Sequence, residues 1–215
     1  MNVQWVNEMQ AYVESLGTAE TPYIPVNYSS DPRSDASKDA AFSTAGEISK
    51  WPSSLGLAAT FDPGTVLDFA KKASSEYHAL GIATALSPQI DLASEPRWLR
   101  VSGTFGEDAA MAGQMAKAYV EGFQGTFSED GASQGWGAES VNAMIKHWPG
   151  DGAGEGGRES HTSAGQYEVM VGANSAEHIS VFQQALDSAA VMTSYSITLD
   201  ANGDPVYTDR KSSSY

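Results

Sequence analysis

The alternation of strand-like and helix-like stretches constrains the fold of this chain more than any other feature. Short apolar runs, typical of buried strands, are separated by stretches in which apolar residues recur with helical spacing. The two kinds of stretch alternate five times, which predicts a parallel sheet with helices on its outside. The expected strands cover residues 23–28, 56–60, 82–90, 141–145 and 189–195.

Helix starts and stops support this alternation. Asp62-Pro63 and Glu107-Asp108 are expected to open two helices, because acidic side chains accept hydrogen bonds from the free N–H groups of a first turn. Gly81 is expected to end the first of these. Another helix is expected near residues 179–186. The first helix of the chain, residues 5–16, is predicted to place Trp5, Met9, Tyr12, Val13 and Leu16 on one stripe.

Polar groups follow the expected strands on one side only. Asp31, the charged stretch 91–100, Lys146-His147 and Tyr195 all come directly after apolar runs. This placement is typical of α/β barrels, which build their sites at the carboxyl ends of the strands. Adjacent strand residues point to opposite faces, so Lys146 and His147 need a twisted or bulged backbone to reach one ligand. The alternative is a surface loop in which the two residues meet by accident.

Composition excludes several classes of function. The chain of 215 residues carries a formal net charge of -15, which argues against nucleic acid and anionic membrane surfaces as partners. Without cysteine, neither thiolate catalysis nor a disulfide framework is possible. No apolar run approaches the length that spans a membrane. The residues after Met1 lack the pattern of a signal peptide, and the compartment stays open.

The strand-end groups are suited to a neutral polyol such as a sugar. Asp31 can accept hydrogen bonds from hydroxyls, and Arg100, Lys146 and His147 can donate to them. Tyr195 can shape the site. Trp98 and Trp148 either stack on a sugar face or pack in the core, whereas for Trp51 core packing is expected.

Two other kinds of site are disfavoured by spacing, and no cofactor or metal is expected. Glu155, Glu159, His161 and His178 lack the tight spacing of a metal motif. The glycines of 150–157 match neither phosphate-binding fingerprint. Glu107 and Asp108 are interpreted as helix-capping residues rather than a catalytic pair.

Seven motifs in order carry a family resemblance. They are Ile24-Pro25-Val26 with Ser30-Asp31-Pro32-Arg33, Trp51-Pro52 with 57–62, Ser87-Pro88-Gln89-Ile90-Asp91, Glu95-Pro96-Arg97-Trp98 through Arg100, 103–108, 146–150, and Met192 with Tyr195-Ser196. Over about residues 5–197 the chain resembles the N-terminal domain of glycoside hydrolase family 3, the β-glucosidase and exo-glucosidase family.

The resemblance implies an α/β fold, a partial TIM (β/α)8-type barrel of about five βα units with parallel strands and outer helices. It also implies β-glucoside hydrolysis with retention of configuration. Asp31 resembles the carboxylate that binds sugar hydroxyls, Arg100, Lys146 and His147 resemble the remaining donors to that ring, and Tyr195 resembles the tyrosine beside the nucleophile. The expected partner is thus a β-glucoside or oligosaccharide. Family members are often periplasmic or secreted.

Departures from the family pattern lead to further expectations. Retaining hydrolysis needs two carboxyl groups about 5–5.5 Å apart. Asp200, Asp204 and Asp209 lack the apolar strand that precedes the family's nucleophile. The acid/base residue of the family usually comes from a second domain. The first barrel strand is also expected to be missing, and Glu159 stands where an aspartate is usual.

We therefore expect residues 1–198 to form an incomplete family 3 barrel domain and residues 199–215 to be a polar tail, an interrupted barrel segment. The chain is expected to carry the sugar-binding subsite but neither the nucleophile nor the acid/base. The alternatives are a catalytically inactive sugar-binding or vestigial fragment and, disfavoured, a metal-dependent hydrolase. An open arc of strands leaves two unpaired edges, so self-association through them is expected.

Overall fold

The computed structural model describes residues 3–32, 34–36, 48–170, 172, 174–206. Its main sheet has four parallel strands in the order β1-β2-β5-β7, which is also their order along the chain. These strands are Ser29–Ser30 (β1), Thr84–Ala85 (β2), Asn142–Trp148 (β5) and Ala190–Thr193 (β7). Consecutive parallel strands with helical crossovers form one arc of a (β/α)8 barrel, as predicted.

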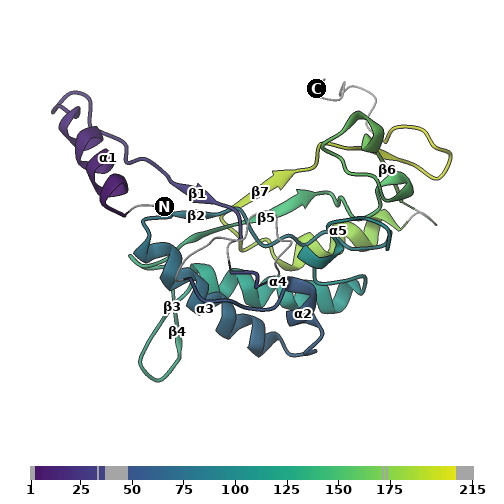
Figure 1. The fold of residues 1–215 in the computed structure, drawn as a ribbon, viewed down its shortest axis with the longest axis horizontal. Coiled ribbons are helices and arrows are strands. Elements are labelled where there is room, and N and C mark those ends of the chain that lie inside the picture. Colours follow the sequence, from purple (N-terminus) through teal and green to yellow (C-terminus); the bar gives the residue numbers. More distant parts are fainter. Residues whose placement is uncertain (1–2, 33, 37–47, 171, 173, 207–215) are drawn as a thin grey trace.

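The helices are Val3–Ser15 (α1), Ser54–Ala58 (α2), Pro63–Ala79 (α3), Ala109–Gln124 (α4) and Ser175–Gln184 (α5). Helices α2 to α5 lie on one face of the sheet, whereas α1 lies apart from them (Figure 1). Short 3-10 helices cover Val101–Gly103, Glu155–Gly157 and Ser163–Gly165. In the described part of the chain, no helix has the length and apolar character needed to cross a bilayer.

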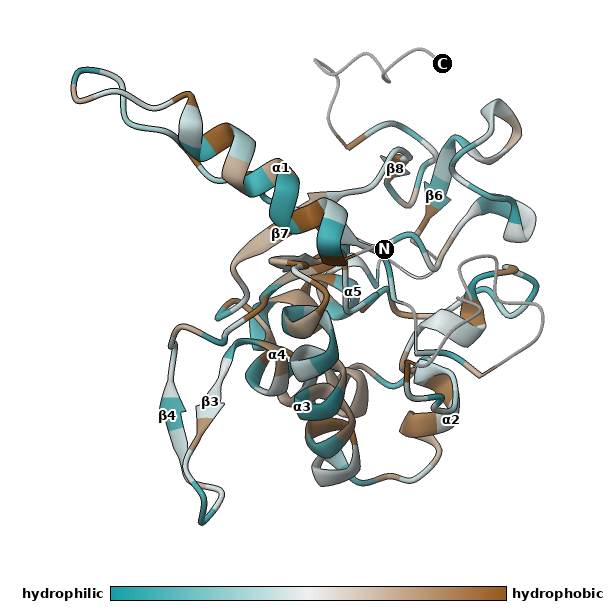
Figure 2. Cartoon of the chain, turned by 60° about the vertical axis from the view of Figure 1, so that its left-hand side comes forward, coloured by the Kyte–Doolittle hydropathy of each residue, from teal (hydrophilic) through white to brown (hydrophobic). Residues whose placement is uncertain are grey.

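Two small sheets extend the molecule beyond the arc. Thr126–Phe127 (β3) and Ser133–Gly135 (β4) form an antiparallel hairpin that projects from the body (Figures 1 and 2). Tyr167–Val169 (β6) pairs in parallel with Ile197–Leu199 (β8). β8 crosses the expected domain boundary at residue 198, and that boundary stays a prediction.

Two of the five expected strands are wrong. Residues 23–28 form no ladder, and pairing begins only at Ser29. Residues 56–60 overlap a helix, α2, because the Ser53 side chain accepts a hydrogen bond from Gly56 N and caps its first turn. Small residues such as Gly56 and Ala58 fit either conformation, so the cap decided between them.

The strand expected at 82–90 is shorter than predicted. Pro88 cannot donate to a ladder, and regular pairing ends at Ala85. The backbone nevertheless returns to its neighbour, because Gln89 forms an isolated parallel bridge with Lys146 and Ile90 N donates to Lys146 O at 2.8 Å. The polar residues after β2 are therefore fixed against β5.

The predicted helix boundaries at α3 and α4 are confirmed. The Asp62 carboxylate accepts hydrogen bonds from Gly64 N and Thr65 N, and Asp108 Oδ1 accepts one from Met111 N at 2.7 Å. Gly81 follows α3 with φ +76°, a conformation that favours glycine. The capping interpretation of Asp108 therefore holds.

The core lies between the sheet and helices α3 and α4. Tyr119 and Phe123 of α4 stack with ring centroids 4.7 Å apart, and Phe123 meets Tyr77 of α3 edge-on. The two helices cross closely at Gly122, where an added Cβ would lie 3.0 Å from Leu67 O. This contact sets how near α3 and α4 approach.

The apolar stripe of α1 is largely exposed. Of this helix only Val6 is buried, and Trp5, Tyr12 and Leu16 are exposed. Figure 2 shows α1 projecting from the body with apolar residues along it. The spacing correctly predicted a helix. It does not tell whether another element packs against the apolar face.

Gly122→Val is expected to lower the free energy of unfolding by about 1–3 kcal/mol, because the added side chain forces α3 and α4 apart. Gln114→Val, an exposed position on the same helix, is the control and should change it by less than about 0.5 kcal/mol. Urea unfolding followed by circular dichroism measures both. Equal effects of the two substitutions would contradict the close crossing.

Candidate functional site

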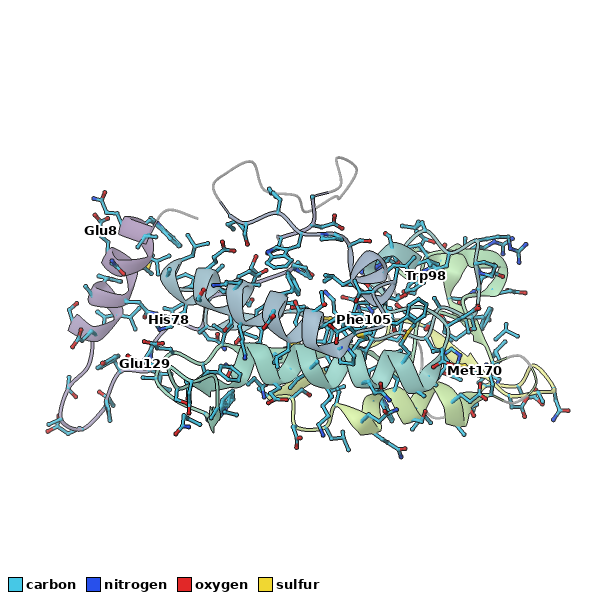
Figure 3. The ribbon with its side chains drawn as sticks, turned by 90° about the horizontal axis from the view of Figure 1, so that it is seen from below. Glu8, His78, Trp98, Phe105, Glu129 and Met170 are labelled. Atoms are coloured by element: carbon cyan, nitrogen blue, oxygen red, sulfur yellow. The ribbon has the colours of Figure 1, made fainter. Side chains whose placement is uncertain are left out.

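A cavity of about 250 Å³ lies at the carboxyl ends of the strands. The arrows of β5 and β7 in Figure 1 point toward the side of the molecule on which Figure 3 labels Trp98 and Met170, away from Glu8 and Glu129. Three of the predicted sugar-binding residues, Asp31, Arg100 and Lys146, line the cavity together with Gln89. The remaining lining includes Pro32, Pro52, Leu57, Phe69, Tyr77, Leu99 and Tyr119.

Asp31 and Lys146 form an ion pair across the sheet. Lys146 Nζ donates to Asp31 Oδ1 at 2.6 Å, with 5% of the lysine side chain and 29% of the aspartate side chain exposed. The Tyr77 hydroxyl donates to Asp31 O at 2.6 Å and holds the backbone there. Burial lowers the pKa of Lys146, and Asp31 opposes this only in part.

The backbone at Lys146 and His147 is irregular, as expected. The pairing of β5 with β7 shifts register between Lys146 and Trp148, and the Lys146–His147 peptide is cis. Both side chains are buried: Lys146 reaches Asp31 in the cavity, and His147, which does not line the cavity, reaches Arg100. The accidental surface pair is thereby excluded.

A buried carboxylate, Asp91, holds His147. Its Oδ2 lies 2.9 Å from His147 Nδ1, and its Oδ1 accepts from the backbone N of His147 and of Asp151 at 2.9 and 2.7 Å. Burial alone would raise the pKa of Asp91, but the hydrogen bonds and charge of His147 outweigh it and lower that pKa. The carboxylate is therefore ionised, and His147 carries a proton on Nδ1.

The Arg100 guanidinium has polar contacts to three residues. Its Nη2 donates to Gln89 Oε1 at 3.1 Å and lies 3.3 Å from His147 Nε2, while Nη1 lies 3.6 Å from Glu159 Oε1. Because His147 Nδ1 faces Asp91, Nε2 is the ring nitrogen that faces this guanidinium. The guanidinium also lies over Trp98 at 5.9 Å.

Tyr195 lies at the edge of the site and does not line the cavity. It is half exposed, and its ring meets His161 edge-on at 5.0 Å. His161 Nδ1 lies 2.6 Å from Glu159 Oε1, and Glu159 in turn faces Arg100. Glu159, where an aspartate was expected, thus makes the link between the edge and the cavity.

Behind His147 lies a second set of buried acids. Asp151 accepts from Ser160 Oγ at 2.8 Å and from the Ser194 and Ser196 hydroxyls. Glu168 Oε2 accepts from Ala153 N at 2.9 Å. Burial, with the charges of Asp151 and Asp91 adding to it, raises the pKa of Glu168 to about 10, so this carboxyl is neutral at pH 7.

The sequence interpretation missed three functional positions. Asp91 was noted as a strand end but given no role, although its place directly after a strand was the available signal. Gln89 had no signal beyond its motif. Glu168 lies in β6, a short strand that the sequence interpretation did not predict. The three tryptophans considered above pack inside the protein: Trp98 is buried, Trp148 packs on Phe182 and Trp51 packs on Phe69.

Among the described residues, no group of histidine and acidic side chains is arranged to hold a metal ion. His161 pairs with Glu159, whereas His178 is buried against Ser94, with Nε2 at 3.3 Å from its hydroxyl. Burial lowers the pKa of His178. The residues considered for a metal cluster therefore lie in separate environments.

Comparison with known proteins gives consistent matches. The model of the glycosyl hydrolase family 3 N-terminal domain matches residues 35–212. Beta-glucosidase C of Emericella nidulans is 41% identical over 186 residues, covering 85% of this chain and 29% of that protein. The periplasmic beta-glucosidase/beta-xylosidase of Dickeya chrysanthemi is 41% identical over 199 residues, covering 90% and 30%.

The fold is shared with solved structures. A β-glucosidase from Erythrobacter marinus superimposes with a TM-score of 0.72 at 25% identity, covering 94% of this chain and 24% of that one. A β-glucosidase from Listeria innocua gives 0.71 at 26% identity, covering 91% and 24%. The chain thus spans less than a third of the length of these relatives.

Asp91→Ala is expected to lower the free energy of unfolding by about 3–5 kcal/mol, because His147 and two backbone N–H groups lose a buried acceptor. Asp130→Ala in the exposed hairpin turn, which also removes a carboxylate bonded to its neighbours, is the matched control. Denaturant unfolding compares the two. A loss below about 1 kcal/mol at Asp91 would contradict its anchoring role.

Glu168 is expected to make the folded state less stable as pH rises. Its pKa is about 10 when folded and near the ordinary 4.5 when unfolded, so in this window the unfolded state has lost a proton that the folded state keeps. The free energy of unfolding then falls at up to about 1.4 kcal/mol per pH unit. Glu168→Gln should flatten this dependence and be more stable than the wild type at pH 8.

Denaturant unfolding between pH 5 and pH 9 measures this effect. Glu121→Gln, an exposed position on α4, is the control and should keep the slope of the wild type. Parallel curves for Glu168→Gln and the wild type would show that Glu168 is ionised in the folded protein.

Proposed function

Because the chain belongs to glycoside hydrolase family 3, we propose that it forms the sugar-binding part of a β-glucosidase-type active site, which hydrolyses β-glucosides with retention of configuration. The observation that supports this most directly is the meeting of Asp31, Lys146 and Arg100 in one cavity from three separate elements. The names of the matched relatives agree with this activity.

The proposed roles follow from the chemistry of each group. Asp31, partly exposed, accepts hydrogen bonds from sugar hydroxyls, and charged acceptors make these bonds short and strong. Lys146 and Arg100 donate to hydroxyl oxygens of the same ring. His147 contacts the ring or orders Arg100, and Tyr195 at the edge borders the reacting bond.

We further propose that neither the nucleophile nor the acid/base is among the described carboxylates. Asp91 and Asp151 are buried and hydrogen-bonded within the protein. Glu168 is buried, and Asp200 accepts hydrogen bonds from Asn202 N and Asp204 N within a turn. Retention needs two carboxyl groups placed on either side of the anomeric carbon, and this set supports no such pair.

The second candidate is a sugar-binding or vestigial protein without hydrolytic activity. This candidate is favoured for the chain alone because the buried carboxylates already accept hydrogen bonds within the protein. Both candidates share the sugar subsite, and they differ in whether turnover accompanies binding. The Dickeya relative is named for both glucosides and xylosides, so β-xylosides are the alternative substrates.

Self-association through strand edges is part of the proposal. Within the described residues, β1 and β7 are the outer strands of the four-stranded sheet. Outer strands present backbone groups that pair readily with another chain.

The 215-residue chain is expected to bind glucose but not to hydrolyse an aryl β-glucoside above the rate in buffer. Asp31→Asn should weaken glucose binding about tenfold, because a charged acceptor becomes neutral and its pairing with Lys146 is lost. Asp68→Asn, exposed on α3, is the matched control. An NMR titration with glucose and a nitrophenol release assay make the two measurements.

Absence of glucose binding by the wild type would refute the sugar subsite. Turnover that Asp31→Asn or Asp200→Asn abolishes would instead show that the chemistry lies within these residues, and the proposal of missing catalytic carboxylates would fall.

A further inference from the structure

Gln89 lies where the sheet meets the sugar cavity. It follows β2, and its backbone pairs with Lys146 in an isolated parallel bridge. Lys146 N donates to Pro88 O at 3.2 Å, and Ile90 N donates to Lys146 O at 2.8 Å. The main chain on both sides of Gln89 is therefore fixed to β5.

The Gln89 side chain is directed at Arg100. It is 7% exposed and lines the cavity, and its Oε1 accepts from Arg100 Nη2 at 3.1 Å. The opposite amide orientation would place NH2 against the guanidinium, with two donors facing each other. The contact therefore fixes which end of the amide meets Arg100.

Arg100 depends on such contacts because no sheet strand carries it. It precedes the 3-10 helix Val101–Gly103, in the connection that follows Asp91. Its guanidinium lies 3.3 Å from His147 Nε2 and 3.6 Å from Glu159 Oε1, both longer than the 3.1 Å contact to Gln89. Gln89 is thus its shortest polar contact among the described side chains.

The space around the Gln89 carbonyl depends on a glycine. An added Cβ at Gly103 would lie 3.1 Å from Gln89 Oε1, which is tighter than ordinary van der Waals contact. A side chain at residue 103 would therefore require the amide of Gln89 to shift by a few tenths of an ångström.

We propose that Gln89 is a positioning residue of the sugar subsite, which acts through Arg100 and does not itself need to contact the sugar. The inference rests on the function proposed above. A long, flexible arginine loses conformational entropy when it binds a ligand. A hydrogen bond to a rigid acceptor already restricts the arginine before the sugar binds, so less entropy is lost on binding. Gln89 is such an acceptor because the sheet holds its backbone.

The test measures glucose affinity of the full chain by NMR titration. Gln89→Met removes the acceptor at similar volume and should weaken glucose binding about three- to tenfold. Gln89→Glu keeps an acceptor toward the guanidinium and should restore most of that loss. Rescue by the glutamate separates a hydrogen bond to Arg100 from a general effect on packing.

A double-mutant cycle tests the route through Arg100. In the Arg100→Met background, Gln89→Met should change the affinity for glucose less than twofold, because the group it acts on is gone. Gln124→Met is the matched control. Gln124 Oε1 accepts from Ala143 N and Ala189 N at the other end of the strands, so this change should reduce stability without weakening glucose binding.

Each outcome decides between the proposals. If the wild type binds no glucose, the proposed function fails and this inference fails with it. If Arg100→Met weakens binding while Gln89→Met does not, only the positioning role is refuted. Additive effects of the two substitutions, or no rescue by Gln89→Glu, also refute it.

Discussion

The site depends on one buried carboxylate. Asp91 has no exposed surface, and it accepts hydrogen bonds from the ring of His147 and from backbone N–H groups on both sides of the turn that follows β5. An ionised group at such a depth is tolerable only when its acceptors are satisfied in this way. The same three hydrogen bonds hold His147 beside Arg100 and fix the backbone at Asp151, where the loop that carries Glu159 begins. The positions of the side chains near the cavity thus depend on a carboxylate buried behind them.

Charges near the cavity are balanced in pairs. Lys146 meets Asp31, His147 meets Asp91, and Arg100 faces Glu159. A ligand entering this array finds donors and acceptors of both kinds but no large unbalanced charge, which suits the neutral hydroxyls of a sugar better than a phosphate or carboxylate group.

Sequence patterns could predict the elements whose signals are local. The caps at Asp62 and Asp108 and the polar groups at strand ends are of this kind, since a few neighbouring residues determine each. The irregular backbone at Lys146-His147 followed from the need for both side chains to reach one site. Residues 56–60 were assigned wrongly because small residues have no strong preference, and a single capping serine decided. The Asp91 anchor depends on partners far along the chain, and no local pattern reveals it or the contact of Gln89 with Arg100.

The loop that bears Glu159 and His161 is closed at its base. Gly154 bridges Glu168, and Val169 N donates to Ala153 O at 2.9 Å, so the two ends of the segment leave and rejoin the body side by side. Compact loops of this kind can vary in sequence and length at little cost to the scaffold. The segment is therefore a natural unit for transplantation. An exchange of residues 155–165 between relatives would change the wall of the site facing Arg100 while the strand register beneath it is kept.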